Sequence, residues 1–177
     1  MKLLLHVCCG PCSTYVINLL KKDYDLELFF FNPNIEPKEE YEKRLKEVKK
    51  YSKKLNVPLH IGKYENDKWR ESVKGHENDP EGGERCSICT RVKFERTARF
   101  ADENNFDIFA TTLTISIYKP AKKINKIGNK IAKKFDIEYL DSDFKQDHGF
   151  EKSCKLSKKN NMYRQTYCGC SFSKDEH

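Results

Sequence analysis

The sequence predicts an α/β fold of three layers, in which helices cover both faces of a mostly parallel sheet of five strands. Two observations lead to this prediction. Short apolar runs alternate along the chain with longer amphipathic stretches, which is the pattern of strands joined by crossover helices. The first apolar run also leads directly into three cysteines on a Gly-Pro turn, at residues 8–12. Ligands and cofactors bind at such strand-to-helix junctions in open parallel sheets.

Five apolar runs have the length of strands, namely 3–7, 25–31, 57–61, 106–112 and 137–140. Helical spacing of apolar residues predicts helices between them, at 11–22, 37–55, from about residue 86 onward, and 120–135. A brief helical segment is expected around Trp69, and the glycine- and proline-containing stretch 75–83 is expected to be a loop. After Leu140 the pattern is lost, so only short helix or loop is expected there.

The junction between the first strand and the first helix is the feature around which the chain is organised. Neighbouring strand residues point to opposite faces, so Cys8 and Cys9 can reach one ligand only if the strand has ended. Gly10 allows backbone angles closed to other residues, and Pro11 suits the first position of a helix. Cys12 lies one turn further on and is expected to line the same pocket without being a ligand.

Length and composition favour a single domain over residues 1–177 with a sizeable core. Charged residues make up 34% of the chain and the formal net charge is +7, which permits an anionic partner such as a nucleic acid. The apolar run 3–7 is too short for a signal-peptide core or a membrane span, so the expected location is the cytoplasm, with no membrane partner. In that reducing compartment, eight cysteines favour metal ligands or redox catalysts over structural disulfides.

Four cysteines form the predicted metal site. Cys86 and Cys89 have the spacing of two ligands on one helical turn and follow a glycine-rich loop. With Cys8 and Cys9 they offer soft ligands from two loops on one edge of the sheet, which suits a 4Fe-4S cluster or an all-cysteine zinc site. An adjacent Cys-Cys pair is unusual for zinc, so the cluster is favoured. The alternative for Cys86 and Cys89 is a pair of buried apolar side chains.

Cys168 and Cys170 form a different kind of pair. A disulfide across one residue closes a small strained ring, and strained bridges are labile. The pair is therefore expected either to cycle between dithiol and disulfide or to bind a second metal. The alternative is an exposed tail with incidental cysteines. Cys154 stands alone and is expected to be a bystander.

The segment 119–134 contains seven lysines and no acidic residue. A solvated helix face is the plain explanation, and a surface for the phosphates of a folded RNA is the functional alternative.

Five blocks of sequence run in order along nearly the whole chain. They are Leu-Leu-Leu-His-Val-Cys-Cys-Gly-Pro-Cys-Ser at 3–13, Phe-Asn-Pro-Asn-Ile at 31–35, Pro-Glu-Gly-Gly-Glu-Arg-Cys at 80–86, Thr-Thr-Leu-Thr-Ile-Ser at 111–116 and Tyr-Arg-Gln-Thr-Tyr-Cys-Gly-Cys at 163–170. Together these blocks resemble the cobalamin-independent epoxyqueuosine reductases.

This resemblance implies an iron-sulfur oxidoreductase for the final step of queuosine synthesis in tRNA, in which the epoxide of epoxyqueuosine loses its oxygen and leaves a cyclopentene. It also implies a Rossmann-like (HUP-type) fold, similar to the nucleotide-binding domains of tRNA-thiolating enzymes. By position, the residues that look like ligands of a 4Fe-4S cluster are Cys8, Cys9, Cys86 and Cys89. Cys168 and Cys170 look like a redox-active pair or the ligands of an adjacent mononuclear iron.

The chemistry of the implied reaction calls for a second redox element. Removing an epoxide oxygen as water consumes two electrons and two protons, whereas a 4Fe-4S cluster normally passes electrons singly. We expect Cys168 and Cys170 to fill this place, with tRNA and an external electron donor as partners. The segment 141–177 is expected to pack over the active-site edge. Further candidates for proton donors or metal ligands are Asp141, Asp143, Tyr163 and Tyr167.

Two alternatives remain open from sequence. A tRNA sulfurtransferase or adenylating enzyme on a similar sheet needs a Gly- and Ser-rich loop after the first strand to cradle ATP phosphates. Here that loop offers thiolates instead, which disfavours ATP. The second alternative is a zinc-stabilised RNA-binding module without catalysis, which iron analysis separates from the reductase.

Overall fold

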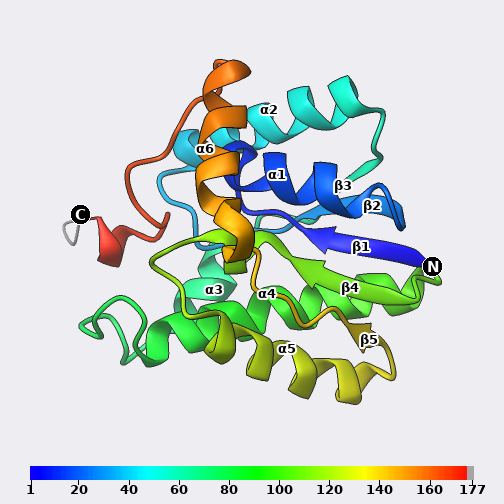
Figure 1. The fold of residues 1–177 in the computed structure, drawn as a ribbon. Coiled ribbons are helices and arrows are strands. Elements are labelled where there is room, and N and C mark those ends of the chain that lie inside the picture. The colour runs from blue at the N-terminus through cyan, green and yellow to red at the C-terminus, as the bar shows by residue number, and fades with distance from the viewer. Residues whose placement is uncertain (175–177) are drawn as a thin grey trace.

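The computed structural model describes residues 1–174, and its strands form one parallel sheet in the order β3-β2-β1-β4-β5 (Figure 1). The strands are β1 (Lys2–His6), β2 (Asp25–Phe30), β3 (Leu59–Ile61), β4 (Ile108–Thr111) and β5 (Glu138–Tyr139). From β1 the chain runs outward to β3 and then returns to the other side of β1 with β4. The strand order therefore reverses between β1 and β4, and ligands bind beyond the carboxyl ends of strands at such a reversal.

The central strand, β1, is apolar on both faces. Leu3, Leu4 and Leu5 have no exposed surface. Leu5 pairs in register with Leu28 of β2 and with Ala110 of β4. A continuous apolar run is what a parallel strand needs when helices cover both faces of the sheet.

The helices are α1 (Gly10–Leu20), α2 (Lys38–Leu55), α3 (Asn66–Ser72), α4 (Glu84–Glu103), α5 (Ala121–Phe135) and α6 (Gly149–Lys159). On one face of the sheet, Val16 of α1 and Val48 of α2 belong to the same core cluster as Leu5. On the other face, Phe94 of α4 and Ile124 of α5 cluster with Leu4 (Figure 1). This confirms the expected three-layer architecture.

Helix α6 is the main departure from the sequence-based expectation of short helix or loop after residue 140. It has 11 residues and lies against α1 (Figure 1). Its contact with α1 is polar, because Ser153 donates a hydrogen bond of 2.6 Å to the Pro11 carbonyl and its hydroxyl lies 3.3 Å from that of Thr14. Small polar residues at a helix contact leave no apolar stripe, so apolar periodicity misses this helix.

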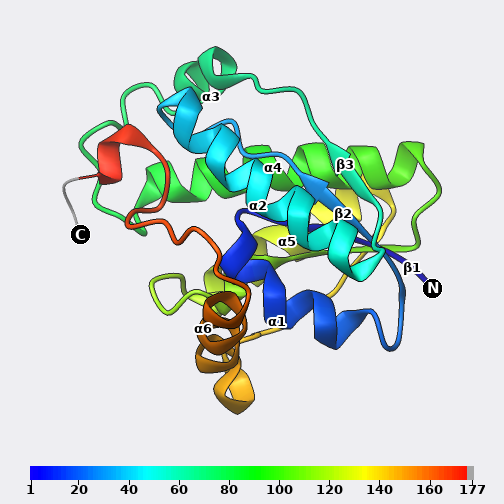
Figure 2. The ribbon, with the colours of Figure 1, turned by 90° about the horizontal axis from the view of Figure 1, so that it is seen from above.

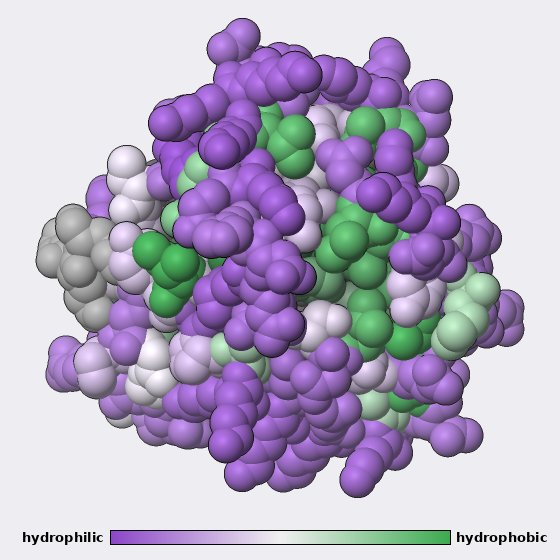
Figure 3. All heavy atoms as spheres, viewed as in Figure 1, coloured by the Kyte–Doolittle hydropathy of each residue, from purple (hydrophilic) through white to green (hydrophobic). Residues whose placement is uncertain are grey.

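After α6 the chain crosses the carboxyl edge of the sheet and reaches α3 and α4 (Figure 2). There Cys170 and Phe172 pack with Trp69 of α3 and with Val73, the residue that follows this helix. The last three residues of the expected segment 141–177 lie outside the described residues. The face seen in Figure 1 is covered mainly by hydrophilic side chains (Figure 3). Among the helices described, none combines the length and the apolar character needed to span a membrane.

Candidate metal centre and adjoining cavities

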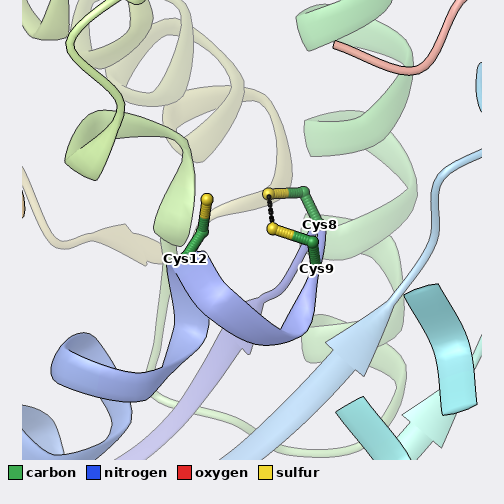
Figure 4. Close-up of side chains that lie close together, drawn as sticks. All are labelled: Cys8, Cys9 and Cys12. Atoms are coloured by element: carbon green, nitrogen blue, oxygen red, sulfur yellow. Dashed lines mark hydrogen bonds between the residues drawn. The ribbon is translucent and has the colours of Figure 1, made fainter. Parts of the chain in front are cut away.

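Three cysteines gather at the junction of β1 and α1. Cys8 lies just after the strand, Cys9 is the N-cap residue of α1, and Cys12 lies in the first turn of the helix (Figure 4). Their sulfur atoms all lie within 4.8 Å of one another, and those of Cys8 and Cys9 are 3.8 Å apart. No other set of three or more Cys, His or acidic side chains in residues 1–174 is grouped this closely.

The local sequence explains this turn. Pro11 occupies the start of α1, where its missing N–H costs nothing, and the Ser13 hydroxyl donates to the Cys9 carbonyl over 2.5 Å. A Cβ atom at Gly10 would lie 2.9 Å from Cβ of Glu47 on α2, so glycine is needed for the close approach of the two helices. The cysteine group is therefore built on the rigid end of the central strand.

Electrostatics favour one thiolate within the group. Hydrogen bonds from the Cys12 and Cys9 thiols hold the pKa of Cys8 well below its usual range, against the effect of burial. The contacts of Cys12 with Cys8 and Cys9, together with burial, raise the pKa of Cys12 well above its usual range. Outside the group, the Gln165 amide donates to the Cys9 sulfur over 3.0 Å. A metal bound here would deprotonate the remaining thiols, because metals bind cysteine as the thiolate.

These donors fit a thiolate-bound metal centre. Soft sulfur ligands select iron-sulfur clusters or zinc. The 3.8 Å between the sulfurs of Cys8 and Cys9 matches the edge, about 3.8 Å, of a tetrahedron with metal–sulfur bonds of about 2.3 Å, which is the spacing of two ligands on one metal ion. In a 4Fe-4S cluster each thiolate binds its own iron, so these two sulfurs would move further apart to hold a cluster. Iron and sulfide content decides between the two centres. Cys12, expected only to line the pocket, is a candidate ligand on the same footing as its neighbours.

Cys86 and Cys89 lie in the first turns of α4 and do not join the group of three. The Cys86 sulfur accepts a hydrogen bond of 3.2 Å from the Gly82 amide, and burial raises the pKa of the Cys86 thiol. Cys89 packs beside Trp69 and Cys170. The ligand set of Cys8, Cys9, Cys86 and Cys89 therefore stays a prediction.

The Cys168–Cys170 segment is held in place mainly through its backbone. The Arg44 guanidinium donates to the carbonyl oxygen of Cys168 over 2.9 Å, and the Glu36 amide donates to that of Gly169 over 2.8 Å. Gly169 has a φ of +130°, which L side chains rarely adopt. All eight cysteines, which fall within the described residues, are free thiols, so the structure contains no disulfide between Cys168 and Cys170.

Two cavities adjoin these cysteines. The first has a volume of about 250 Å³ and is lined by Cys8 and Cys12, by α6 and by the segment that follows it. The second, of about 50 Å³, is lined by Cys86, Cys89, Cys168 and Cys170. Residues that line both cavities include Asn34, Lys93, Lys119 and Cys168. Cys168 therefore faces both groups of cysteines.

Lys119 is the charged partner of Cys168. Its ammonium donates to the Cys168 sulfur over 3.2 Å and lies 3.6 Å from a carboxylate oxygen of Glu81. Burial works against the charge of Lys119, but these two neighbours outweigh it and raise the pKa of the lysine. The Cys168 sulfur is therefore held beside a buried positive charge.

Two of the four expected proton donors lie away from these cavities. Asp141 accepts hydrogen bonds from Asn125 and Asn129, and both Asp141 and Asp143 line a separate third cavity between α1 and α5. Neither aspartate lines the two cavities beside the cysteines, so a role for them at the site stays a prediction.

The two tyrosines lie on the segment that follows α6. Tyr163 is partly exposed and donates to Glu40 over 2.7 Å, and burial, followed by this contact, raises its pKa to about 12. Tyr167 lines the first cavity, but its hydroxyl donates to the Glu36 carbonyl. Both hydroxyls therefore have protein partners.

Sequence reasoning missed Lys93, Lys119 and Gln165 as residues of this site. Lys119 lies in the lysine-rich segment, whose lysines were treated alike, and Lys93 is one of many lysines on helices. Gln165 and Asn34 do lie in blocks that carry the family resemblance, which was the available signal.

Comparison with known proteins finds one family. The chain matches the family model described as "Epoxyqueuosine reductase QueH" over residues 3–176. It is 42% identical over 174 residues to the epoxyqueuosine reductase QueH of Acinetobacter baylyi, covering 97% of this chain and 80% of that protein. It is 36% identical over 173 residues to the epoxyqueuosine reductase QueH of Thermotoga maritima, and the match covers 96% of this chain and 88% of that protein.

Two solved structures share the fold. A "predicted subunit of tRNA methyltransferase" from Methanocaldococcus jannaschii aligns with a TM-score of 0.57 at 14% identity, over 89% of this chain and 75% of that chain. The U34-tRNA thiolase NcsA from Methanococcus maripaludis, solved with its [4Fe-4S] cluster, aligns with a TM-score of 0.59 at 12% identity. The alignment covers 97% of this chain and 61% of that chain. At such identities these likenesses speak for the fold alone, and they confirm the expected HUP-type architecture.

The match of the family model extends from β1 to beyond Cys170 and so includes every cysteine discussed above. The curated relatives are 34% to 42% identical over nearly the whole chain. Family membership therefore decides against the two alternatives left open by the sequence, a sulfurtransferase and a zinc-stabilised binding module. The chain belongs to the QueH family of epoxyqueuosine reductases, which are oxidoreductases.

Proposed function

We propose that this enzyme removes the epoxide oxygen of epoxyqueuosine in tRNA at the first cavity, using a metal centre held by the adjoining cysteines. The observation that carries the proposal is the contact of this cavity with both sets of sulfurs. Cys8 and Cys12 line it from one side and Cys168 lines it from another. The epoxide-bearing ring of the nucleoside, when held in this cavity, would lie between a thiolate-bound metal and the thiol of Cys168.

The cofactor that we propose is a 4Fe-4S cluster. The gathering of Cys8 and Cys9 at the end of β1 supports their place in the predicted ligand set, and it adds Cys12 as a third sulfur. Cys86 and Cys89 are then the candidates for completing the set from the second cavity. When bound, such a cluster supplies electrons one at a time.

Cys168 and Cys170 are proposed as the second redox element. Oxidation of two thiols to a disulfide releases two electrons and two protons, which equals what the epoxide needs to become an alkene and water. The disulfide would then be reduced by an external electron donor. Lys119 supports this role, because its ammonium holds the Cys168 sulfur at the cavity through a hydrogen bond of 3.2 Å. The alternative for the pair, an adjacent mononuclear iron, would act as a Lewis acid on the epoxide oxygen.

We further propose that tRNA lies along α5, starting from the cavities. Lys119 and Lys123 line the second cavity at the amino end of α5. The exposed lysines of the helix are Lys122, Lys123, Lys126, Lys130, Lys133 and Lys134. In the described part of the chain, only Lys134 of these six forms an ion pair. Fifteen residues of helix span about 22 Å, enough to contact several phosphates. Action on tRNA would place the enzyme in the cytoplasm.

The deciding experiment is anaerobic reconstitution of the protein with iron and sulfide, followed by a single turnover with tRNA that contains epoxyqueuosine. Nucleoside mass analysis should show the loss of one oxygen, and the protein should contain both iron and acid-labile sulfide. A protein that binds only zinc, or that returns the nucleoside unchanged when fully reduced, contradicts the proposal.

A further inference from the structure

Lys93 is a buried lysine that faces two cavities. It lies on α4, only 5% of its surface is exposed, and it lines both the first and the second cavity. Among residues 1–174, no side chain forms a hydrogen bond or ion pair with its ammonium. The other cations of the first cavity have partners, since Arg44 pairs with Glu40, Lys119 pairs with Glu81, and Arg164 donates to the Cys154 sulfur. Fully buried lysines are rare unless they are paired.

The groups near Lys93 leave its ammonium available to a ligand. Lys93 acts on the Cys8 thiol through its charge alone. The ring of His6 is occupied by the Thr111 hydroxyl at 3.0 Å and the Phe31 carbonyl at 3.1 Å. A buried charge left in this condition costs stability, and groups that lower stability in this way concentrate at functional sites.

Three hydrogen-bond acceptors in the first cavity also lack donors. The side-chain oxygens of Asn32, Asn34 and Gln165 are buried and have no hydrogen-bond partner in the described part of the chain. All three residues line the first cavity, and Asn32 and Asn34 are each 1% exposed. The Gln165 amide group is fixed, because its nitrogen donates to the Cys9 sulfur over 3.0 Å. Native proteins leave few buried polar atoms unsatisfied, so such a concentration calls for a ligand.

We infer that Lys93, Asn34 and Gln165 form a recognition site for the oxygenated ring of the modified nucleoside, with the Lys93 ammonium donating to its epoxide oxygen. This inference rests on the proposed function. The ring of epoxyqueuosine carries an epoxide oxygen, which accepts hydrogen bonds, and hydroxyl groups, which donate them. The cavity offers the complementary groups, a cationic donor and unpartnered amide oxygens, among them those of Asn34 and Gln165. An unmodified guanosine has no such ring.

The size of the cavity agrees with this occupant. Its volume of about 250 Å³ is below the range of about 300–1,000 Å³ typical of sites for drug-sized ligands. A single small ring fits, and the rest of the nucleoside then lies toward the opening. An ammonium placed on the epoxide oxygen would also stabilise the negative charge that develops on it as a carbon–oxygen bond breaks.

The test compares binding by the anaerobically reconstituted protein, kept oxidised so that no turnover occurs. Affinity is measured for tRNA carrying epoxyqueuosine and for the same tRNA carrying guanosine at that position. We expect the wild type to prefer the modified tRNA, and Lys93→Met to lower this preference about tenfold or more, as expected for loss of a hydrogen bond from a charged group. Lys93→Arg should retain part of the preference. The control is Lys22→Met, an exposed lysine just beyond the end of α1, remote from its cysteines.

Thermal unfolding supplies the second readout. Removing an unpartnered buried charge should leave the melting temperature of Lys93→Met equal to or above that of the wild type. A lower melting temperature or a failure to fold would show that Lys93 is structural and would overturn the inference. Retention of the full preference by a folded, iron-loaded Lys93→Met protein would overturn it as well. A wild type without any preference would instead contradict the proposed function.

Discussion

The Arg44 guanidinium, which lines the first cavity, donates a hydrogen bond of 2.9 Å to the carbonyl oxygen of Cys168. A second hydrogen bond of 3.1 Å reaches the Tyr167 carbonyl, and the third arm of the guanidinium binds Glu40 over 2.7 Å. Arg44 is 2% exposed. One buried side chain thus connects α2 to the backbone that carries the Cys-Gly-Cys segment.

Arg44→Lys should therefore displace Cys168 while keeping the positive charge beside Glu40. A lysine cannot reproduce the forked contacts of a guanidinium, and the loss should lower the free energy of unfolding by about 2 kcal/mol. Single-turnover deoxygenation should fall at least tenfold, because small displacements of a reacting group are costly. Urea unfolding and nucleoside mass analysis measure the two effects. The control is Arg91→Lys, because Arg91 is exposed and lies 3.7 Å from Glu84 in a surface ion pair. Its free energy of unfolding and its deoxygenation activity should both stay close to those of the wild type.

Replacement of Cys168 or Cys170 by serine should abolish single-turnover deoxygenation if the pair supplies reducing equivalents. Under the dithiol assignment, each variant keeps the iron content of the wild type. Under the second-iron assignment, each variant loses one iron per chain. Inductively coupled plasma analysis of iron, together with the turnover assay, separates these outcomes. Full single-turnover activity in either variant would remove the pair from the mechanism.

Serine variants of the remaining cysteines distinguish the ligand sets. If the group of three at the start of α1 holds the metal, Cys12→Ser should lower iron and sulfide content as strongly as Cys8→Ser. If the sequence-based set is correct, Cys86→Ser and Cys89→Ser should do so, and Cys12→Ser should not. Cys154→Ser is the matched control, since Cys154 lines the first cavity outside the group of three. Iron and labile-sulfide assays after anaerobic reconstitution give the answer directly.

Much of the fold follows from the sequence because its strands and most helices carry strong periodic patterns. The run Leu3–Leu5 marks the central strand, and the Gly10-Pro11 turn marks the start of α1. Helix α6 lacks this signal because Ser153 and Ser157 face the protein where apolar residues are expected. Strand β5 has only two residues, fewer than the apolar run 137–140 suggests. It lies at the edge of the sheet and pairs only with β4.

The site was less predictable than the fold, because it depends on side-chain orientations, which the spacing of residues in the sequence does not determine. Two cysteines on a turn and a third one helical turn later can point together or apart, and only the tertiary structure places Cys12 with Cys8 and Cys9. Lys93 is a stronger case. Lysines on an amphipathic helix are normally solvated, so no pattern in the sequence marks this one as buried.

Glu36 should control the docking of the Cys-Gly-Cys segment in a pH-dependent way. Burial raises the pKa of its carboxyl group, but hydrogen bonds from Ser171 at 2.7 Å and Arg70 at 2.6 Å outweigh burial and leave the pKa below its usual range. A lowered folded-state pKa means that the stabilisation is present above the unfolded pKa, about 4.3, and is lost as the pH falls through the folded value.

Amide hydrogen exchange over residues 169–173 checks this prediction. At pH 7 the variant Glu36→Gln should exchange faster than the wild type, and the difference should shrink below about pH 4 as the wild-type carboxylate takes up its proton. Glu71→Gln is the control, because Glu71 is exposed and is paired only with Lys74 at 3.6 Å. Equal exchange of wild type and Glu36→Gln at pH 7 would show that Glu36 does not hold the segment.

Charge reversal on α5 tests the proposed path of the tRNA. Lys122 and Lys126 are exposed near the start of this helix, and neither forms an ion pair within residues 1–174. The double variant Lys122→Glu/Lys126→Glu should weaken tRNA binding at least tenfold. A plot of log affinity against log salt concentration should also become less steep, with its slope smaller in magnitude by about one to two. Each phosphate contact contributes about 0.7 to 0.9 to this slope.

The matched control is Lys21→Glu/Lys22→Glu, which changes the net charge by the same amount just beyond the opposite end of α1 from the cysteines. A nonspecific effect of net charge would weaken binding equally in both double variants and would leave the salt dependence of the two alike. A specific path along α5 lowers affinity and slope only in the first variant. Because the cavity residues are untouched, that variant should recover its turnover rate at saturating tRNA, so the defect appears in KM and not in kcat.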